Sequence, residues 1–459
     1  MNHNKWLLLD VPGLGKSLSA IRLAEELKSR ENIEHCLVIC GLNSLKRNWK
    51  SEIKKFSQLD SIIIGEHISK KGNISTKSIP ERVKQLKEPI EEFFVIINIE
   101  SLRSEEIIDA IMKGKNKFPL IILDEAHTCK SPQSQQGKNL LKTSSKYQLG
   151  MTGTLLLNNP LDTYVALKWI GAEHSSYTNF RYHYCVYGGP FNNELVGYQN
   201  TDQLKEQIEN FSLRRTKDLI KDLPTKNIIN EFVEMDDKQS KFYENIKKGI
   251  LNERKSGVRL FPANLLAMTT RFRQATECPS ILTKEDIPSA KIERTVDLCD
   301  QLLSDPKEKV VIFTFFKETC DVLMDKLKQY NPLLCTGDIP DDIVNQRKDT
   351  FNSDDEHRIL IGTGQKMGTG FSLSSKCQYL ICVGYPWTAG ILGQWEDRIH
   401  RVDNKRPAFI YLLWTLDTFD EYQKELIETK GAIADYMIDD NQSPELMNKL
   451  KKYIQDLQD

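Results

Sequence analysis

The segment Asp10–Ser17 constrains the fold of this chain more than any other part of the sequence. It reads Asp-Val-Pro-Gly-Leu-Gly-Lys-Ser and follows the apolar run Trp6–Leu9. Apolar residues then recur at i, i+3, i+4 and i+7 from Ala20, which predicts an amphipathic helix. Glycines let backbone N–H groups surround phosphate oxygens, and a helix N-terminus adds partial positive charge. The order of strand, glycine-rich loop and helix therefore predicts a phosphate-binding loop.

Within this loop each residue type has an expected role. Backbone N–H groups that face phosphate oxygens are expected from Gly13, Leu14 and Gly15. Lys16 is expected to reach the β- and γ-phosphates of a nucleotide, and the Ser17 hydroxyl is expected to ligate Mg²⁺. Asp10 stands where the strict pattern has glycine.

A pair of carboxylates follows another apolar run about a hundred residues downstream. Asp124 and Glu125 come directly after Leu120–Leu123. A carboxylate at the carboxyl end of a parallel strand is well placed to hold Mg²⁺, so Asp124 is expected to be a metal ligand. Glu125 is expected to orient and deprotonate the attacking water. An acidic turn at a strand end is common by itself, but its pairing with the predicted phosphate-binding loop argues against chance.

Short apolar runs alternate with helical patterns over most of the 459 residues, which predicts an α/β fold. The predicted strands of the first half are Trp6–Leu9, Cys36–Cys40, Phe93–Ile97 and Leu120–Leu123. Those of the second half are Val310–Phe313, Ile359–Ile361, Tyr379–Val383 and Phe409–Leu413. The region between the halves reads as helical and richly charged. We therefore expect a first parallel-sheet lobe over 1–165, a mostly helical insertion over 166–290, a second lobe over 291–417 and a helical tail over 418–459.

Composition excludes several classes of protein. The chain has 63 Lys and Arg against 64 Asp and Glu, so its overall charge gives no sign of nucleic-acid binding. No run approaches the ~20 apolar residues of a membrane span, and the N-terminus has no signal-peptide pattern. The ten cysteines form no metal-binding spacing, which favours reduced thiols in a cytoplasm.

A third motif lies late in the chain, in Gln394–Arg401. Arg398 and Arg401 are three residues apart and are expected to share one helical face. An arginine from a second domain can stabilise the γ-phosphate of a bound nucleotide during hydrolysis. Without other motifs, a solvated charged helix explains this segment better.

The order and spacing of these motifs resemble helicase superfamily II and, in detail, the Swi/Snf-type DNA translocase ATPases. Asp10–Ser17 resembles motif I, and the DEAH-type sequence Asp124–His127 resembles motif II. The other matching segments are Leu37–Cys40 with Leu45, Trp49 and Glu52 (motif Ia), Ile96–Leu102 (Ib), Lys130–Ser134 (extension of II), Leu149–Thr154 with Asn158 and Asn159 (III), Leu213–Asp218 with Leu223 and Pro224 (the arginine-threonine-lysine segment), Ile312–Phe313 (IV), Gly362–Leu373 (V) and Gln394–Arg401 (VI).

The resemblance implies two RecA-like lobes that bind ATP and Mg²⁺ in the cleft between them. Hydrolysis is then expected to depend on Lys16, Ser17, Asp124, Glu125 and Arg401, with Arg398 as the second choice of finger. Gln394 is expected to sense the γ-phosphate, and Gly370 of motif V to contact the nucleotide. Thr152 and Thr154 are expected to relay the nucleotide state to the nucleic acid.

The sequence departs from the family pattern in four places. Only nine residues precede Asp10, so the usual upstream glutamine segment that contacts adenine is missing; a protein partner, a longer chain or another means of reading adenine are the open explanations. Leu155 replaces the proline of motif III. The usual acidic residue and Asn-Pro pair around Trp387, and the Gly-Gln after motif VI, are also replaced. The phosphate and Mg²⁺ ligands are intact.

The leading hypothesis is an ATP-dependent translocase on double-stranded DNA, of compact bacterial or phage type and located in the cytoplasm. The alternatives are a helicase that unwinds or anneals DNA, and a weakly hydrolysing, nucleotide-gated protein-binding module. Contacts to nucleic-acid phosphates are expected from two basic clusters, Lys46, Arg47, Lys50, Lys54 and Lys55 in the first, and Arg214, Arg215 and Lys217 in the second. Trp49, inside the first cluster, is expected to be a packing residue.

Overall fold

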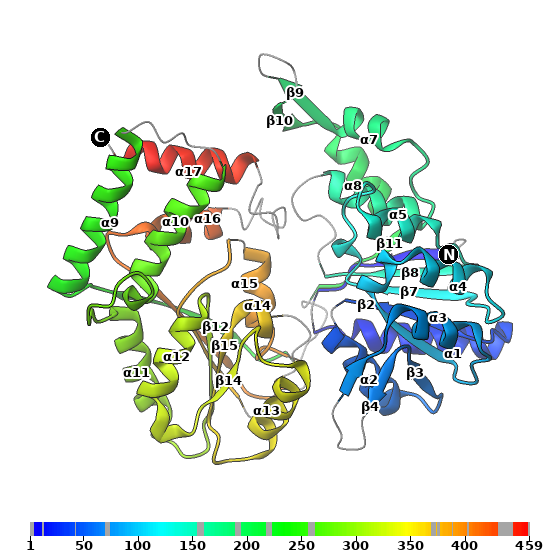
Figure 1. Cartoon of the computed structure of the whole chain (residues 1–459), viewed down its shortest axis with the longest axis horizontal. Helices are drawn as coiled ribbons and strands as arrows, with labels where there is room; N and C mark the ends of the chain where they lie inside the picture. The colour runs from blue at the N-terminus through cyan, green and yellow to red at the C-terminus, as the bar shows by residue number, and fades with distance from the viewer. Residues whose placement is uncertain are drawn as a thin grey trace. The chain divides into compact units, whose positions relative to one another are not determined.

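The computed structural model describes residues 4–11, 13–41, 43–68, 74–153, 160–188, 194–216, 223–255, 262–368, 373, 377–387, 389–401, 404–429 and 444–457. The chain divides into two compact units, Met1–Leu219 and Ile220–Asp459, here called unit 1 and unit 2. Each unit has its own parallel β-sheet (Figure 1).

Unit 1 is built on a seven-stranded sheet in the order β11-β1-β8-β7-β2-β6-β3, in which every pair of neighbours is parallel. Its strands are β1 (Lys5–Leu8), β2 (Cys36–Cys40), β3 (Ser61–Ile63), β6 (Phe94–Asn98), β7 (Leu120–Asp124), β8 (Tyr147–Met151) and β11 (Ser212–Leu213). Two separate antiparallel pairs are β4 (Glu66–Ile68) with β5 (Ile74–Thr76), and β9 (Cys185–Gly188) with β10 (Glu194–Tyr198).

Helices cover both faces of this sheet because both sides of its central strands are apolar. Leu37 and Ile39 of β2 pack into one cluster, whereas Cys36 and Val38 pack into the other. The second cluster receives α1 (Lys16–Glu31) and α2 (Asn43–Phe56). The first receives α3 (Ile79–Lys87), α4 (Glu105–Lys113), α5 (Gln135–Lys142), α6 (Tyr164–Trp169), α7 (Tyr177–Tyr184) and α8 (Thr201–Asn210).

Unit 2 contains a six-stranded parallel sheet in the order β12-β17-β16-β13-β15-β14. Its strands are β12 (Lys226–Val233), β13 (Val310–Thr314), β14 (Leu333–Cys335), β15 (Ile359–Thr363), β16 (Tyr379–Cys382) and β17 (Ala408–Thr415). One face packs against α11 (Ala290–Leu302) and α12 (Lys317–Lys326). The other packs against α13 (Asp341–Ser353), α14 (Gly364–Met367) and α15 (Ala389–Glu396).

A helical layer with a core of its own completes unit 2. It consists of α9 (Asp237–Lys255), α10 (Pro262–Glu277), α16 (Phe419–Thr429) and α17 (Pro444–Asp456). Figure 1 shows these four helices together. The C-terminal helices therefore pack against α9 and α10, from which they are separated in the sequence by strands β13 to β17.

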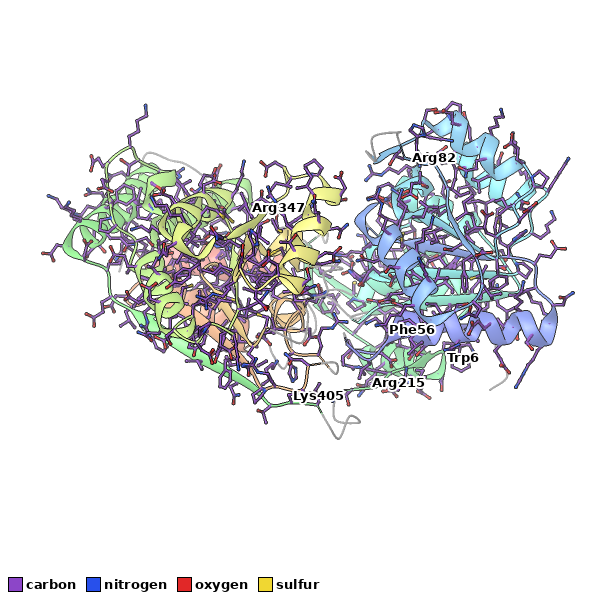
Figure 2. The ribbon with its side chains drawn as sticks, turned by 90° about the horizontal axis from the view of Figure 1, so that it is seen from below. Trp6, Phe56, Arg82, Arg215, Arg347 and Lys405 are labelled. Carbon is purple, nitrogen blue, oxygen red and sulfur yellow. The ribbon has the colours of Figure 1, made fainter. Side chains whose placement is uncertain are left out.

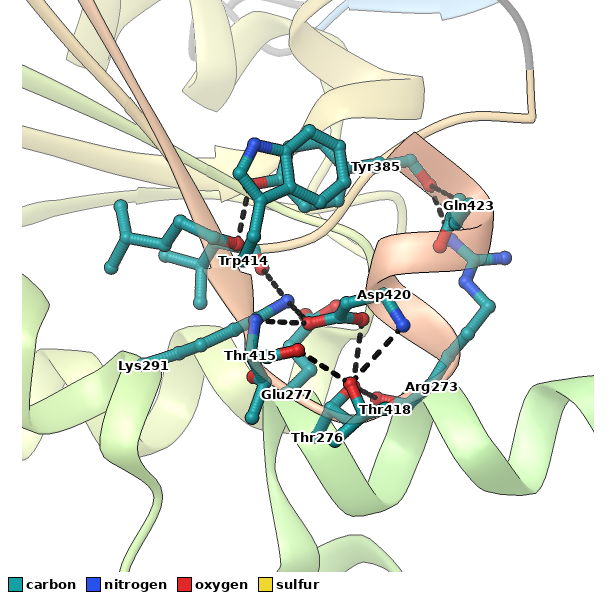
Figure 3. A network of polar contacts seen from close by, with 12 residues as sticks. Arg273, Thr276, Glu277, Lys291, Tyr385, Trp414, Thr415, Thr418, Asp420 and Gln423 are labelled. Atoms are coloured by element: carbon teal, nitrogen blue, oxygen red, sulfur yellow. Dashed lines mark hydrogen bonds and ion pairs between the residues drawn. The ribbon is translucent and has the colours of Figure 1, made fainter. Parts of the chain in front are cut away.

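A buried ionic network joins this helical layer to the sheet (Figure 3). The Lys291 ammonium lies 2.5 Å from the Asp420 carboxylate, and both side chains are almost fully buried. Glu277, at the end of α10, accepts hydrogen bonds from the backbone N–H groups of Phe315 and Phe316 at 3.0 and 3.2 Å. Because a buried charge is costly without a partner, each of these contacts favours one position of the helices against the sheet.

The eight strands predicted from apolar runs all exist, with ends shifted by at most two residues. The region expected to be a mostly helical insertion, 166–290, contains helices α7 to α10 together with strands β9 to β12, and the division between the units falls inside it. Strand β12 alternates exposed and half-buried residues and includes Lys226, Asn227 and Glu231, so it lacks the apolar run of a central strand. Among the described helices, none is long and apolar enough to cross a membrane.

Candidate nucleotide-binding site

The predicted phosphate-binding loop joins β1 to α1, in the expected order of strand, loop and helix. Gly13 and Gly15 have φ values of +89° and +75°, in the left-handed region that residues with a Cβ rarely adopt. Gly15 is also the N-cap of α1, and the first turn of this helix has no acidic residue. The partial positive charge at the helix N-terminus is therefore not offset there, which suits the binding of an anionic phosphate.

Lys16 is the first residue of α1, and its side chain turns back over the loop. Its Nζ donates a hydrogen bond to the backbone carbonyl of Asp10 at 2.9 Å. Ser17 follows on the first helical turn and is half-buried. The ammonium and the hydroxyl therefore both lie at the N-terminus of α1, as the motif requires.

Three neighbouring strands end beside this loop. Asp124 ends β7 and is in register with Met151 at the end of β8. Thr152 follows Met151, and its backbone N–H donates to the carbonyl of Leu8 on β1 at 3.1 Å. Because parallel strands end on the same edge of a sheet, the loop after β1, Thr152 and the carboxylates after β7 share one edge.

Asp124 is held by hydrogen bonds on both carboxylate oxygens. The indole Nε1 of Trp49 donates to Oδ2 at 2.9 Å, and the backbone N–H of Glu125 donates to Oδ1 at 3.0 Å. Burial, followed by repulsion from Glu125, raises the pKa of Asp124 to about 7, while Trp49 and Lys16 act in the opposite direction. A bound cation offsets this desolvation, because it favours the charged carboxylate.

Glu125 has an unusual backbone conformation, with φ +51° and ψ +52°. The left-handed region is costly for a residue with a Cβ, and such outliers gather at functional sites. The turn is held by the carbonyl of Glu125, which accepts from the N–H and the hydroxyl of Thr128 at 2.9 and 2.8 Å. The Glu125 side chain is 38% exposed, so water can reach it.

His127 connects the carboxylate segment after β7 to the residue after β8, the strand that lies between β7 and β1. Its Nδ1 lies 2.9 Å from Oγ1 of Thr152 and 3.2 Å from a carboxylate oxygen of Glu125. Thr152 is completely buried, so its hydroxyl has a fixed position. This chain of contacts links the end of β7 to the end of β8.

The residues present fit a Mg²⁺ ion that is bound together with a nucleotide. Ser17 offers a hydroxyl oxygen and Asp124 a carboxylate, which are the hard oxygen donors that Mg²⁺ prefers. In the described part of the chain, no group of three or more His, Cys, Asp or Glu residues is placed to hold a metal. Mg²⁺ commonly takes only one or two protein ligands and completes its shell with phosphate oxygens and water.

The loop is also tied to the segment by which the chain leaves unit 1. Asp10 is completely buried, and the Arg215 guanidinium contacts both of its carboxylate oxygens, with Nε at 3.1 Å from Oδ1 and 3.0 Å from Oδ2. The hydrogen bond to Asp10 raises the pKa of Arg215. Arg215 was expected in a basic cluster for nucleic-acid phosphates, but it forms an ion pair with Asp10. Figure 2 labels Arg215 among the side chains of unit 1.

In the first basic cluster Lys50, Lys54 and Lys55 are exposed, whereas the other two residues are not. Lys46 is buried, and this burial lowers the pKa of its ammonium. Arg47 and Lys50 share Glu66 at 3.1 and 3.9 Å. Trp49 is buried, as expected of a packing residue, and its additional hydrogen bond to Asp124 was not foreseen.

In unit 2, Gln394 lies on α15, and this helix ends at Glu396. Arg398 and Arg401 come after the helix instead of sharing one of its faces, and Arg398 Nε donates to the carbonyl of Gln394 at 2.9 Å. All three expected site residues of this segment are half-buried. Gly370 and Thr154, to which roles were also assigned, lie outside the described residues.

The same segment is tied to the start of the unit 2 sheet. Lys226, the first residue of β12, places its ammonium 2.6 Å from the carboxylate of Glu396. His400 Nε2 lies 2.8 Å from the carbonyl of Pro224. Sequence patterns gave no signal for these contacts, because more than 160 residues separate the partners.

Comparison with known proteins shows the family to which this chain belongs. Residues 1–281 match the SNF2-related domain, and residues 290–403 match the helicase conserved C-terminal domain. The first match alone covers more than half of the chain. The chain therefore belongs to the SNF2-related family of helicase-type enzymes, which confirms both the family and the two-sheet α/β fold expected from the sequence.

The individual relatives have low sequence identity to this chain. The chain is 24% identical over 443 residues to the uncharacterized ATP-dependent helicase MG018 of Mycoplasma genitalium, covering 94% of this chain and 40% of the relative. It is 24% identical over 501 residues to the DNA repair and recombination protein RDH54 of Saccharomyces cerevisiae, covering 96% of this chain and 52% of the relative. Among solved structures, it is similar to the Sulfolobus solfataricus SWI2/SNF2 ATPase core in complex with dsDNA, with 21% identity, a TM-score of 0.43 and coverage of 99% of this chain and 92% of that one.

Proposed function

We propose that this chain hydrolyses ATP to ADP and phosphate and uses the reaction to move along double-stranded DNA without separating its strands. The observation that carries the proposal is the shared edge of β1, β8 and β7. The Lys16 loop, Thr152 and the Asp124–Glu125 pair all follow strands that end there. A phosphate-binding loop beside a buried carboxylate is the arrangement that nucleotide hydrolysis requires.

Each residue of this edge has a defined task. The loop N–H groups and Lys16 bind the β- and γ-phosphates, and Ser17 and Asp124 hold Mg²⁺. When bound, Mg²⁺ neutralises negative charge on the phosphate oxygens. Glu125 orients the attacking water and accepts its proton while the oxygen bonds to the γ-phosphorus. The bond from that phosphorus to the bridging oxygen breaks, and ADP and phosphate leave.

We assign the remaining contacts to the γ-phosphate to unit 2. Arg401 is the first choice for stabilising the charge that develops during transfer, and Arg398 is the second. In other nucleotide hydrolases such an arginine contributes about 10³–10⁵ in rate. Gln394, whose carbonyl holds Arg398, is assigned to sensing the γ-phosphate.

DNA as the partner is supported by the SNF2-related family and by the name of the yeast relative, a DNA repair and recombination protein. A motor that moves along DNA of any sequence must contact the phosphate backbone, so its affinity for DNA should fall steeply as the salt concentration rises. The contact of His127 with Thr152 supplies a route by which the state of Glu125 can reach the end of β8.

The test measures steady-state ATP hydrolysis by the full chain without nucleic acid and with single-stranded DNA, duplex DNA or RNA. Strong stimulation by duplex DNA, lost in Lys16→Ala, supports the proposal. Displacement of the third strand from a DNA triplex, without release of single strands from a forked duplex, distinguishes translocation from unwinding. Equally low activity in all four conditions, matching that of Lys16→Ala, would overturn it.

A further inference from the structure

Asp10 places a fully buried carboxylate at the first position of the phosphate-binding loop, where the strict pattern has glycine. An unneutralised negative charge at this position opposes the binding of a polyphosphate. It also attracts the ammonium of Lys16, which already donates to the backbone carbonyl of the same residue at 2.9 Å. The loop therefore needs a cation that cancels the carboxylate.

Arg215 supplies this cation through an extended set of contacts. Its guanidinium reaches both carboxylate oxygens of Asp10, and its backbone N–H donates to Oδ1 at 2.9 Å. Its Nη2 also lies 3.2 Å from the hydroxyl of Ser19 in α1. Arg215 thus contacts the first residue of the loop and the helix that follows the loop.

The segment that contains Arg215 runs beside β1 and is hydrogen-bonded to it as far as the loop. The carbonyls of Phe211, Leu213 and Arg215 accept from the N–H groups of alternate residues of unit 1, Leu7, Leu9 and Val11, at 2.9, 2.8 and 3.2 Å. The guanidinium therefore belongs to a segment that is held against β1, and its position does not depend on the side chain alone.

We propose that Arg215 is a positioning residue of the nucleotide site: it cancels the charge of Asp10 and leaves Lys16 available for the phosphates. This inference rests on the proposed function and deepens it, because it assigns ATP affinity to a residue outside the loop. Arg215 does not touch the nucleotide in this proposal. It acts through Asp10.

The test is equilibrium binding of a fluorescent ATP analogue with Mg²⁺ to the full chain. Arg215→Ala should weaken binding at least about tenfold, because a like charge beside a bound anion is strongly unfavourable. Asp10→Asn combined with Arg215→Ala removes both charges and should return the affinity to within about threefold of the unaltered chain. Arg215→Lys keeps the positive charge but loses the two-pronged guanidinium. Its affinity should lie between those of the single and the double variant.

Arg30→Ala is the matched control, because Arg30 is an exposed arginine of α1 that pairs with Glu26 far from the loop. Circular dichroism and thermal unfolding show whether each variant is folded. Unchanged affinity in Arg215→Ala would overturn the inference, as would equal weakness of the single and double variants, since that result assigns Arg215 a purely structural role. Lack of binding by the unaltered chain would overturn the proposed function and this inference with it.

Discussion

The indole Nε1 of Trp49 donates a hydrogen bond to Oδ2 of Asp124 across 2.9 Å. Trp49 lies on α2, and Asp124, a proposed Mg²⁺ ligand, ends β7. Both side chains are largely buried, so the bond fixes the direction in which the carboxylate can present its other lone pairs. A residue that packs α2 against the sheet therefore also orients the proposed Mg²⁺ ligand.

Trp49→Phe keeps most of the packing but removes this hydrogen bond. We expect the Mg²⁺ concentration for half-maximal ATP hydrolysis to rise about three- to tenfold, because a hydrogen bond to a charged group contributes about 1.5–3 kcal/mol, part of which is recovered from water. Mg²⁺ titrations of the ATPase rate measure this change. The control is Trp169→Phe, which removes an equivalent bond to Thr143 at 2.9 Å and should leave the Mg²⁺ dependence unaltered.

Thr152→Val tests the contact between His127, which follows β7, and Thr152, which follows β8. Valine has nearly the same shape, so ATP hydrolysis without DNA should remain within about threefold, while stimulation by duplex DNA should fall about tenfold or more. The ATPase assay with and without DNA gives both numbers. Equal loss of the two activities would contradict a coupling role. Thr269→Val, which removes a buried hydroxyl bonded to the Leu265 carbonyl at 2.9 Å in unit 2, controls for the loss of a buried hydroxyl.

Gly15→Ala tests the backbone conformation of the loop. At φ +75° an alanine costs about 1 kcal/mol, and the loop can relieve this strain only by leaving the phosphate-binding geometry. We expect ATP affinity to fall about fivefold or more in the binding assay. Gly249→Ala is the control, because this glycine lies inside α9 with nothing within 4 Å of an added Cβ. There alanine should raise the free energy of unfolding by about 0.5–1 kcal/mol and leave ATP affinity unchanged.

Lys226→Met tests the tie between β12 and the arginine segment. It removes the lysine partner of Glu396, whose side chain is only 7% exposed, so we expect unit 2 to lose about 1–3 kcal/mol in urea unfolding. Adding Glu396→Gln should recover about half of that loss or more. Lys328→Met removes an exposed pair with Asp325 and should change stability by less than about 0.5 kcal/mol. A similar effect of both lysine substitutions would count against a special role for Lys226.

Local sequence determined the parts of the protein that depend on neighbouring residues. The loop needed Gly13 and Gly15 for their positive φ, and the apolar run of β2 was predicted with its observed bounds, Cys36–Cys40. Central parallel strands are buried on both faces, so they read as continuous apolar runs that can be recognised without any partner. Edge strand β12 escaped the same reasoning because its residues alternate in burial.

Only the tertiary structure decided which distant side chains meet at the site. Trp49 and Asp124 are 75 residues apart, and Asp10 and Arg215 are 205 apart. Their meeting depends on the order of strands in the sheet, in which β11, formed late in unit 1, pairs with β1 at the start of the chain. The spacing of residues along the chain carries no record of that order. The sequence showed that Asp10 stands where the strict pattern has glycine, and only the fold showed that Arg215 pairs with its carboxylate.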